Sequence, residues 1–232
     1  VEIAAGTSNT SFALKSNGTI WGWGSNPSSI IVSGSGTTTV STPTQVGTDS
    51  DWVKMSVGGG HILAQKQNGT LWSWGGGDAL GVGGTPYITN IPQQVTTDTW
   101  KSFSTGTGTS FGVNSDGTLW AWGVNDFGKL GTGTTTSSSI PIQIGTSTWK
   151  MVKAGNNHSV GIKSDGTLWA WGDNQDGNIG DGTFINRLTP TQISTATNWK
   201  VVNCNLSRSI AIKEDGTLWV WGFNSPALGV AG

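Results

Sequence analysis

The chain has 232 residues and a formal net charge of −1, and only 11% of its residues are charged. Such a composition lacks the basic surface with which proteins bind DNA or RNA, so no nucleic-acid partner is expected. No run of about 18 apolar residues occurs, so no membrane-spanning helix is expected either.

Five copies of one motif, Asn/Asp-Gly-Thr-x-Trp-x-Trp-Gly, follow one another along the chain. They occupy residues 17–24, 68–75, 116–123, 165–172 and 215–222, so that their turn glycines are 51, 48, 49 and 50 residues apart. A nearly fixed period of this length indicates stacked copies of one supersecondary unit. We therefore predict a single all-β domain over residues 1–232. Its repeats cover about 1–50, 51–98, 99–147, 148–197 and 198–232, the last incomplete.

The fourth repeat shows the expected elements most clearly. Residues 149–155, 158–163 and 167–172 read as strands, and a long polar connection leads to a short strand at 190–193. The Asp-Gly pair favours a tight hairpin because glycine adopts positive φ without strain. The last strand begins with proline, which suits an outer edge, where no ladder hydrogen bond is lost. Each repeat is thus predicted to be a four-stranded antiparallel sheet.

Tryptophan is the residue type that this scheme accounts for most fully. Four of the 14 tryptophans open a repeat (Trp52, Trp100, Trp149, Trp199) and ten lie in the paired motif. Residues two apart in a strand point to the same face, so the two members of each pair share one bulky face. One sheet cannot bury such a face alone, and we predict that each pair is buried between consecutive sheets.

A glycine ends the first strand of most repeats. Gly6, Gly58, Gly106 and Gly155 take this position, and the last repeat has Asn205 there. Asparagine replaces glycine best where φ is positive. We therefore predict a positive φ at this position.

Candidate catalytic or metal-binding side chains are few. His61 and His158 occupy the same position in two repeats and are interpreted as structural. Cys204 stands where other repeats have small residues, so it is predicted to fill space in the core. Residues 173–182 resemble a calcium-binding loop but lack its distal glutamate, which favours ordinary turns. We predict no catalytic, cofactor or metal site, and therefore no enzyme activity.

Several motifs together resemble a known family. Residues 116–125 (Asp-Gly-Thr-Leu-Trp-x-Trp-Gly-x-Asn), the Leu-Gly-x-Gly loop at 130–133, and Gly155 followed by His158-Ser159 are similar to repeats of the regulator of chromosome condensation family, in its bacterial and bacteriophage style. The resemblance covers essentially the whole chain. It implies a β-propeller of four-stranded blades, commonly seven, that works mostly through protein–protein contact.

Five repeats are fewer than such a ring usually contains. The sequence also stops inside the loop that follows its last motif. We interpret the chain as part of a longer polypeptide that forms a larger ring. A closed five-bladed ring, and an open arc completed by a neighbouring chain, are the alternatives.

The function expected from these features is that of a non-enzymatic protein-binding or structural module. Low charge and many Ser, Thr and Asn residues are typical of extracellular β-proteins, so we expect a bacteriophage virion or a bacterial surface as its location. One alternative is a secreted propeller that inhibits an enzyme. Another is a scaffold domain whose larger polypeptide has a catalytic part elsewhere.

The long loops between third and fourth strands vary most between repeats. Loops on a rigid scaffold are where binding residues concentrate. Tyr87 in one loop, and Phe184, Ile185 and Arg187 in another, are large groups of the kind that anchor interfaces. We predict that these four residues contact a protein partner. The alternative is that they pack beneath their own loops.

Overall fold

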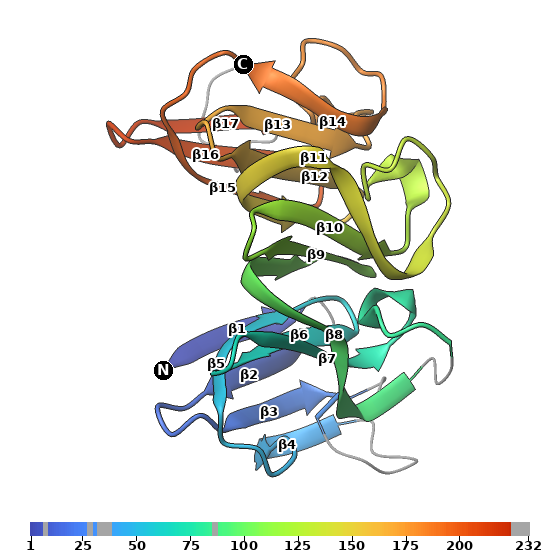
Figure 1. Cartoon of the computed structure of the whole chain (residues 1–232), viewed down its shortest axis with the longest axis vertical. Helices are drawn as coiled ribbons and strands as arrows, with labels where there is room; N and C mark the ends of the chain where they lie inside the picture. Colours follow the sequence, from blue (N-terminus) through green and yellow to red (C-terminus); the bar gives the residue numbers. More distant parts are fainter. Residues whose placement is uncertain (7–8, 27–29, 32–38, 85–87, 224–232) are drawn as a thin grey trace.

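The computed structural model describes residues 1–6, 9–26, 30–31, 39–84 and 88–223, and these residues form β-strands with two short 3-10 helices. The strands make five antiparallel sheets, here called blades 1 to 5. Figure 1 shows the blades following one another along the long axis of the molecule, from blade 1 in blue to blade 5 in orange and red. The predicted all-β architecture of antiparallel blades is confirmed.

Within each blade the strands lie side by side in chain order. Blade 1 consists of β1 (Glu2–Gly6), β2 (Thr10–Leu14), β3 (Ile20–Ser25) and β4 (Thr39–Gln45). Blade 2 consists of β5 (Trp52–Val57), β6 (His61–Lys66), β7 (Thr70–Gly76) and the first half of β8 (Ile88–Thr105). Blade 3 consists of the second half of β8, β9 (Thr109–Asn114), β10 (Thr118–Gly123) and the first half of β11 (Ser138–Ala154). Blade 4 consists of the second half of β11, β12 (His158–Lys163), β13 (Leu168–Gly172) and β14 (Arg187–Ser194). Blade 5 consists of β15 (Trp199–Asn205), β16 (Arg208–Lys213) and β17 (Leu218–Gly222). The 3-10 helices η1 (Asp78–Leu80) and η2 (Asp126–Gly128) lie in the loops after β7 and β10.

Strands β8 and β11 each belong to two blades. The first half of β8 pairs with β7 as the outer strand of blade 2, and its second half pairs with β9 as the first strand of blade 3. Strand β11 connects blades 3 and 4 in the same way. A continuous strand therefore carries the chain from one blade to the next.

The Asp-Gly-Thr-x-Trp motif is a hairpin turn joined to a chain of hydrogen bonds. Gly117 has a φ of 93°, and its equivalents in the other four blades also have positive φ. The Trp120 indole N–H donates to the Thr118 hydroxyl at 3.0 Å, and that hydroxyl donates to the Asp116 carboxylate at 2.7 Å. Hydrogen bonds from the Thr118 backbone N–H and hydroxyl hold the pKa of Asp116 below its ordinary value. The same relay occurs in all five blades.

The two tryptophans of a pair lie in different surroundings, which corrects part of the prediction. Trp74, Trp122 and Trp171, the second members in blades 2 to 4, are fully buried between blades. The first members of those three pairs are only half-buried, and their indole N–H donates to a threonine of their own blade. In blade 5 the first member, Trp219, is 50% exposed.

The prediction of positive φ at the end of the first strand is wrong. Gly58, Gly106, Gly155 and Asn205 are absent from the residues with positive φ. The constraint is a close approach of neighbouring blades: a Cβ on Gly106 would collide with the Gly155 carbonyl oxygen and the Ala154 Cβ. At this place the Thr107 N–H also donates to the Gly155 carbonyl, from one blade to the next. Asn205 is exposed in blade 5, so a side chain fits there.

Among the described residues, each blade packs on its neighbours in the sequence, and blades 1 and 5 lie at opposite ends of the array (Figure 1). The five sheets therefore form an open arc. The closed five-bladed ring considered from the sequence is not observed.

We expect Gly106→Ala to lower the free energy of unfolding by about 1–3 kcal/mol, because the added methyl group overpacks the contact with blade 4. The matched control is Asn205→Ala, at the equivalent exposed position, which should change stability by less than about 0.5 kcal/mol. Urea denaturation followed by tryptophan fluorescence measures both. Equal effects of the two substitutions would contradict the close-approach explanation.

Thr118→Val should lower the free energy of unfolding by about 1–2 kcal/mol, because the indole N–H of the half-buried Trp120 loses its acceptor. The control is Thr135→Val at an exposed loop position, which should be nearly neutral. The comparison uses the same denaturation measurement. A neutral Thr118→Val would show that the relay adds nothing to stability.

Candidate protein-binding loop

The joints between blades are held by a backbone carbonyl of the loop that follows the third strand. The Ala79 carbonyl of blade 2 accepts hydrogen bonds from Trp122 Nε1 and Ser110 Oγ of blade 3, both at 2.8 Å. The Lys129 carbonyl of blade 3 and the Asn178 carbonyl of blade 4 each accept the same two donors from the next blade. We call this arrangement the joint clamp.

The two histidines extend the joint clamp. His61 Nε2 lies 2.8 Å from Ser110 Oγ, and His158 Nε2 lies 2.9 Å from Ser209 Oγ. Each serine already donates its proton to the loop carbonyl, so the histidine is the donor and carries its proton on Nε2. Burial lowers the pKa of both histidines to about 4. They are therefore neutral parts of the scaffold at physiological pH.

Cys204 is buried at the joint between blades 4 and 5. Burial raises the pKa of its thiol to about 12, so the nucleophilic thiolate is scarce at neutral pH. Its position agrees with the space-filling role inferred from the sequence. Within the described residues no group of three His, Cys, Asp or Glu side chains is placed to hold a metal ion.

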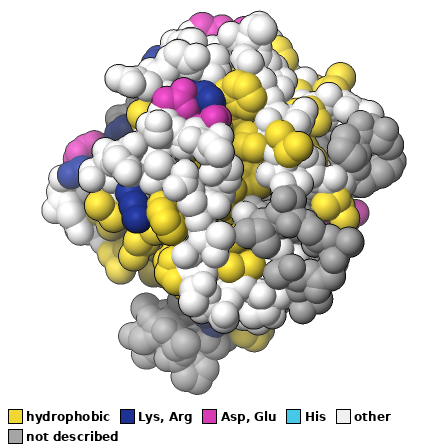
Figure 2. Space-filling model, turned by 90° about the horizontal axis from the view of Figure 1, so that it is seen from below, with side chains coloured by type: hydrophobic (Ala, Val, Ile, Leu, Met, Phe, Trp, Pro, Cys, Tyr) yellow, Lys and Arg dark blue, Asp and Glu magenta, His cyan; other side chains and the backbone are white. Residues whose placement is uncertain are grey.

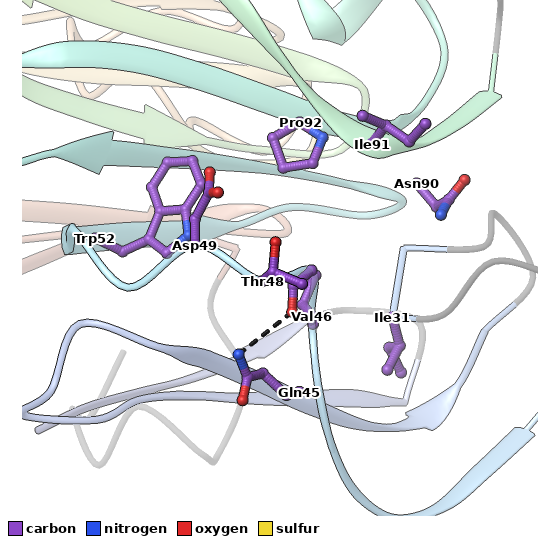
Figure 3. Close-up of a pocket in the computed structure, with 10 residues that line it drawn as sticks. Ile31, Gln45, Val46, Thr48, Asp49, Trp52, Asn90, Ile91 and Pro92 are labelled. Carbon is purple, nitrogen blue, oxygen red and sulfur yellow. Dashed lines mark hydrogen bonds between the residues drawn. The ribbon is translucent and has the colours of Figure 1, made fainter.

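Grooves of about 350 Å³ lie at two equivalent joints. Figure 3 shows the groove between blades 1 and 2, with Ile91 and Pro92 on one side and Gln45 and Val46 on the other. The Gln45 amide donates to the Gly47 carbonyl at 3.3 Å, the bond drawn in the figure. The groove between blades 3 and 4 repeats this arrangement with the equivalent residues. Because equivalent residues line both grooves, we attribute the grooves to the way in which neighbouring blades pack.

The loop between β13 and β14, residues 173–186, is held in place by hydrogen bonds to a buried asparagine. Asn174 Nδ2 donates to the Thr183 and Ile185 carbonyls at 2.9 and 3.1 Å, and its Oδ1 accepts the Ile179 N–H at 2.9 Å. Asn125 holds the corresponding loop of blade 3 in the same way. In the sequence this asparagine stands two residues after the Trp-Gly of the motif. That it anchors the loop was not predicted from the sequence.

An ion pair adds a second fastening to the loop. Arg187 Nε donates to Asp181 Oδ2 at 2.6 Å, and Asp181 also accepts the Thr183 N–H and hydroxyl. Burial opposes ionisation of Asp181, but hydrogen bonds from Thr183 and Arg187 outweigh it and lower the pKa of that carboxyl. Asp181, which belongs to the calcium-like segment, therefore stabilises the loop.

The structure separates the four residues predicted to contact a partner. Phe184 and Ile185 lie on the outer side of the fastened loop and are 73% and 63% exposed. Arg187 is half-buried and paired with Asp181, so it supports the loop from inside. Tyr87 lies outside the described residues. A contact role for these residues stays a prediction.

The exposure of Phe184 and Ile185 belongs to their position in the repeat and does not result from a missing neighbouring blade. Their equivalents in blade 3 are Thr135 and Thr136, which are also exposed although blade 4 packs beside them. The position therefore faces solvent when the next blade is present. Blade 4 places two large apolar side chains where blade 3 has threonines.

Comparison with known families gives two matches, both described as the regulator of chromosome condensation (RCC1) repeat. One matches residues 116–162 and 165–210, and the other matches residues 1–29 and 150–178. Together they cover just over half of the chain. The chain belongs to the RCC1-repeat family. No curated protein matches this RCC1-repeat chain in sequence.

Solved structures give the same fold for this RCC1-repeat protein. Prp20p of Saccharomyces cerevisiae is 25% identical with a TM-score of 0.81, over 96% of this chain and 58% of that one. Yeast RCC1 (Prp20) bound to Kap60 is 24% identical with a TM-score of 0.81, over 93% and 54%. Human WBSCR16 is 20% identical with a TM-score of 0.83, over 96% and 61%. The chain thus spans 54–61% of the length of these proteins.

The surface of this RCC1-repeat protein has few charged side chains. On the face seen in Figure 2 most of the surface is uncharged, with scattered charged groups and several apolar patches. Among the described residues, no helix has the length and hydrophobicity needed to cross a membrane.

We expect acid to destabilise the fold through the two histidines. Their folded pKa of about 4 lies below the ordinary 6.5, so the unfolded chain binds more protons as the pH falls between these values. The contribution of the histidines to the free energy of unfolding is fully present above about pH 6.5. It is lost as the pH falls toward 4, by up to about 3 kcal/mol per histidine. Unfolding by urea at a series of pH values measures this loss.

The comparison variant is His61→Thr combined with His158→Thr, since threonine is the residue that blade 3 has at this position. It should be less stable at pH 7 but lose much less stability between pH 7 and pH 4. Carboxylates titrate in both proteins, so their contribution cancels in the difference. An unchanged pH dependence would show that the histidines are not the groups responsible.

Proposed function

We propose that this RCC1-repeat protein is a non-enzymatic protein-binding module that docks a partner through the loop between β13 and β14. The observation that carries the proposal is the pair Phe184 and Ile185, exposed on a loop that is anchored by Asn174 and by the Asp181–Arg187 ion pair. Large apolar side chains that are held in place before binding are typical of interface hot spots.

The anchoring favours binding because it lowers the entropy lost on association. A loop whose backbone carbonyls are already bonded to Asn174 does not have to be ordered by the partner. Arg187 takes part as a positioning residue beneath the loop. The exposed apolar pair fits a partner surface of apolar chemistry, and the charges of its loop are three aspartates and one arginine, which favours a protein over the phosphates of a nucleic acid.

The structural neighbours support this class of function. Yeast RCC1 (Prp20) has been solved bound to Kap60, and Prp20p has been described together with its binding to Gsp1p and histones. RCC1-type propellers are commonly binding or regulatory proteins. The partner of this chain is proposed as a protein by that analogy and by the exposed apolar pair.

For the cellular setting we propose a bacteriophage virion or a bacterial surface, outside the cytoplasm. The support is the low charge content together with a surface rich in uncharged polar groups (Figure 2). Partners in a regular assembly would favour this setting. A single captured enzyme that loses activity would favour a secreted inhibitor, and substrate turnover by the parent polypeptide would favour a scaffold role beside a catalytic domain.

The test is Phe184→Ser combined with Ile185→Ser. Partners are first identified by photo-crosslinking from position 184 in the native source, and their affinity for the purified proteins is then measured. We expect the double variant to bind at least about tenfold more weakly, because it removes both anchors. Its thermal midpoint should stay close to that of the wild type, because both side chains are exposed.

Two controls make the result specific. Crosslinking from Thr135, the equivalent exposed position of blade 3, should not yield the same partner. Ile88→Ser combined with Ile91→Ser removes exposed apolar groups from the outer strand of blade 2 and should leave affinity unchanged. Equal binding by wild type and the Phe184/Ile185 variant would disprove the proposed docking loop.

A further inference from the structure

The two equivalent grooves differ in charge. Among the described residues that line them, Lys163 is the only charged one in the groove between blades 3 and 4, and Asp49 is the only charged one in the groove between blades 1 and 2. Asp49 and Ser147 occupy equivalent places, because each is the second residue after the glycine whose carbonyl accepts the glutamine amide. The groove between blades 3 and 4 therefore has a hydroxyl where its counterpart has a carboxylate.

In the groove between blades 1 and 2 that carboxylate binds a lysine. Lys66 Nζ lies 2.8 Å from Asp49 Oδ2 and 3.2 Å from Asp51 Oδ1. The same ammonium lies 5.0 Å from the centre of the Trp52 ring, and Figure 3 shows Asp49 on the Trp52 side of the groove. Burial opposes the charge of Lys66, but hydrogen bonds to Asp49 and Asp51 outweigh it and raise the pKa of the ammonium. The chain itself thus supplies a carboxylate to this groove.

Lys163 occupies the equivalent position of blade 4 without such a partner. Its Nζ lies 3.5 Å from the centre of the Trp169 ring and 5.4 Å from that of Trp149. The ammonium makes no hydrogen bond or ion pair with a described residue. Asp165 is engaged by the N–H and hydroxyl of Thr167 instead. Burial lowers the pKa of Lys163, against a smaller opposing effect of Asp165. A positive charge is therefore held in this groove without a carboxylate to neutralise it.

The rest of this lining suits a small apolar body. Ile144 belongs to the blade 3 side of the groove and Pro190 to the blade 4 side, and the half-buried Trp169 ring lies between the two blades. The Ser147 hydroxyl makes no hydrogen bond with a described residue, so it can donate to a ligand. The volume of about 350 Å³ is at the lower end of the range for small-molecule pockets.

We propose that the groove between blades 3 and 4 binds a carboxylate with a small apolar body, either a free organic acid or the C-terminus of a protein. Lys163 binds the carboxylate as Lys66 binds Asp49, through charge-assisted hydrogen bonds that are stronger than neutral ones. A carboxylate is favoured over other anions because the chain places one at the same position of the counterpart groove. No residue of the loop between β13 and β14 takes part, so this site is independent of the proposed partner binding.

Isothermal titration calorimetry tests this site with phenylacetate as the free acid and acetyl-Gly-Gly-Leu as the peptide C-terminus. Each is compared with its neutral amide. The titrations use a Lys213→Gln background, because Lys213 also lies over two tryptophans and lines a groove between blades 4 and 5. We expect a Kd of roughly 0.1–1 mM for at least one of the two acids.

The amide of that acid should bind at least about tenfold more weakly, because it lacks the charge that Lys163 binds. Binding of phenylacetate alone would assign the site to small acids, and binding of the peptide alone would assign it to protein C-termini. Equal binding of acid and amide, or no binding of either acid, would overturn the proposal.

Two substitutions locate the binding in this groove. Lys163→Gln removes the ammonium, and Ser147→Asp supplies the carboxylate that the counterpart groove already has. Each should weaken binding of the acid by at least about tenfold. Lys200→Gln removes an exposed lysine elsewhere and should bind like the parent protein. Circular dichroism confirms that each variant is folded. Unchanged affinity in both groove variants would contradict the proposed site.

The reciprocal experiment opens the other groove. Asp49→Ser combined with Asp51→Thr gives the groove between blades 1 and 2 the residues that its counterpart has before the tryptophan, Ser147 and Thr148. Lys66 then loses both carboxylates, and we expect the protein to bind two acid molecules instead of one. An unchanged stoichiometry would contradict the comparison of the two grooves on which the proposal rests.

Discussion

The arc depends on the burial of a tryptophan indole N–H between blades. A buried N–H without an acceptor costs on the order of 1–3 kcal/mol, so each joint needs a carbonyl at a fixed place. The loop of the preceding blade supplies it, at Ile30, Ala79, Lys129 and Asn178. Because the acceptor is in a loop, the loop itself must be rigid, and the asparagines that anchor it follow from this requirement.

The residues at the base of each loop hold the blades together, whereas the residues at its tip do not take part in the joint. The carbonyl, the buried leucine or isoleucine and the anchoring asparagine are committed to the joint. Residues beyond them, such as Thr135 in blade 3 and Phe184 in blade 4, face solvent and are free to differ. The same scaffold can therefore carry an inert loop tip in one blade and an apolar pair in the next.

Much of the fold could be predicted from the sequence, because periodicity and alternation are properties of the chain itself. The repeat length, the strand order and the shared face of each tryptophan pair all follow from spacing. The different surroundings of Trp120 and Trp122 did not follow, since they depend on which blade supplies the acceptor. Gly106 was misinterpreted for the same reason: its constraint is the backbone of a neighbouring blade, which no local pattern reveals. For the candidate site, exposure of Phe184 could be anticipated from its loop, whereas the ion pair that holds Arg187 could not.

The hydrogen-bonding groups at the joints also bear on how the repeats find their correct neighbours during folding. Between blades 2 and 3, and between blades 4 and 5, a histidine donates to a serine. Between blades 3 and 4 the serine is present, but Thr109 stands in place of the histidine. Blade 2 has Ile62 where the later blades have that serine. If blade 4 packed on blade 2, His158 would meet Ile62 and its imidazole N–H would be buried without an acceptor. Similar repeats in one chain risk pairing out of order, and this mismatch penalises wrong neighbours in a sequence whose blades otherwise have nearly interchangeable faces.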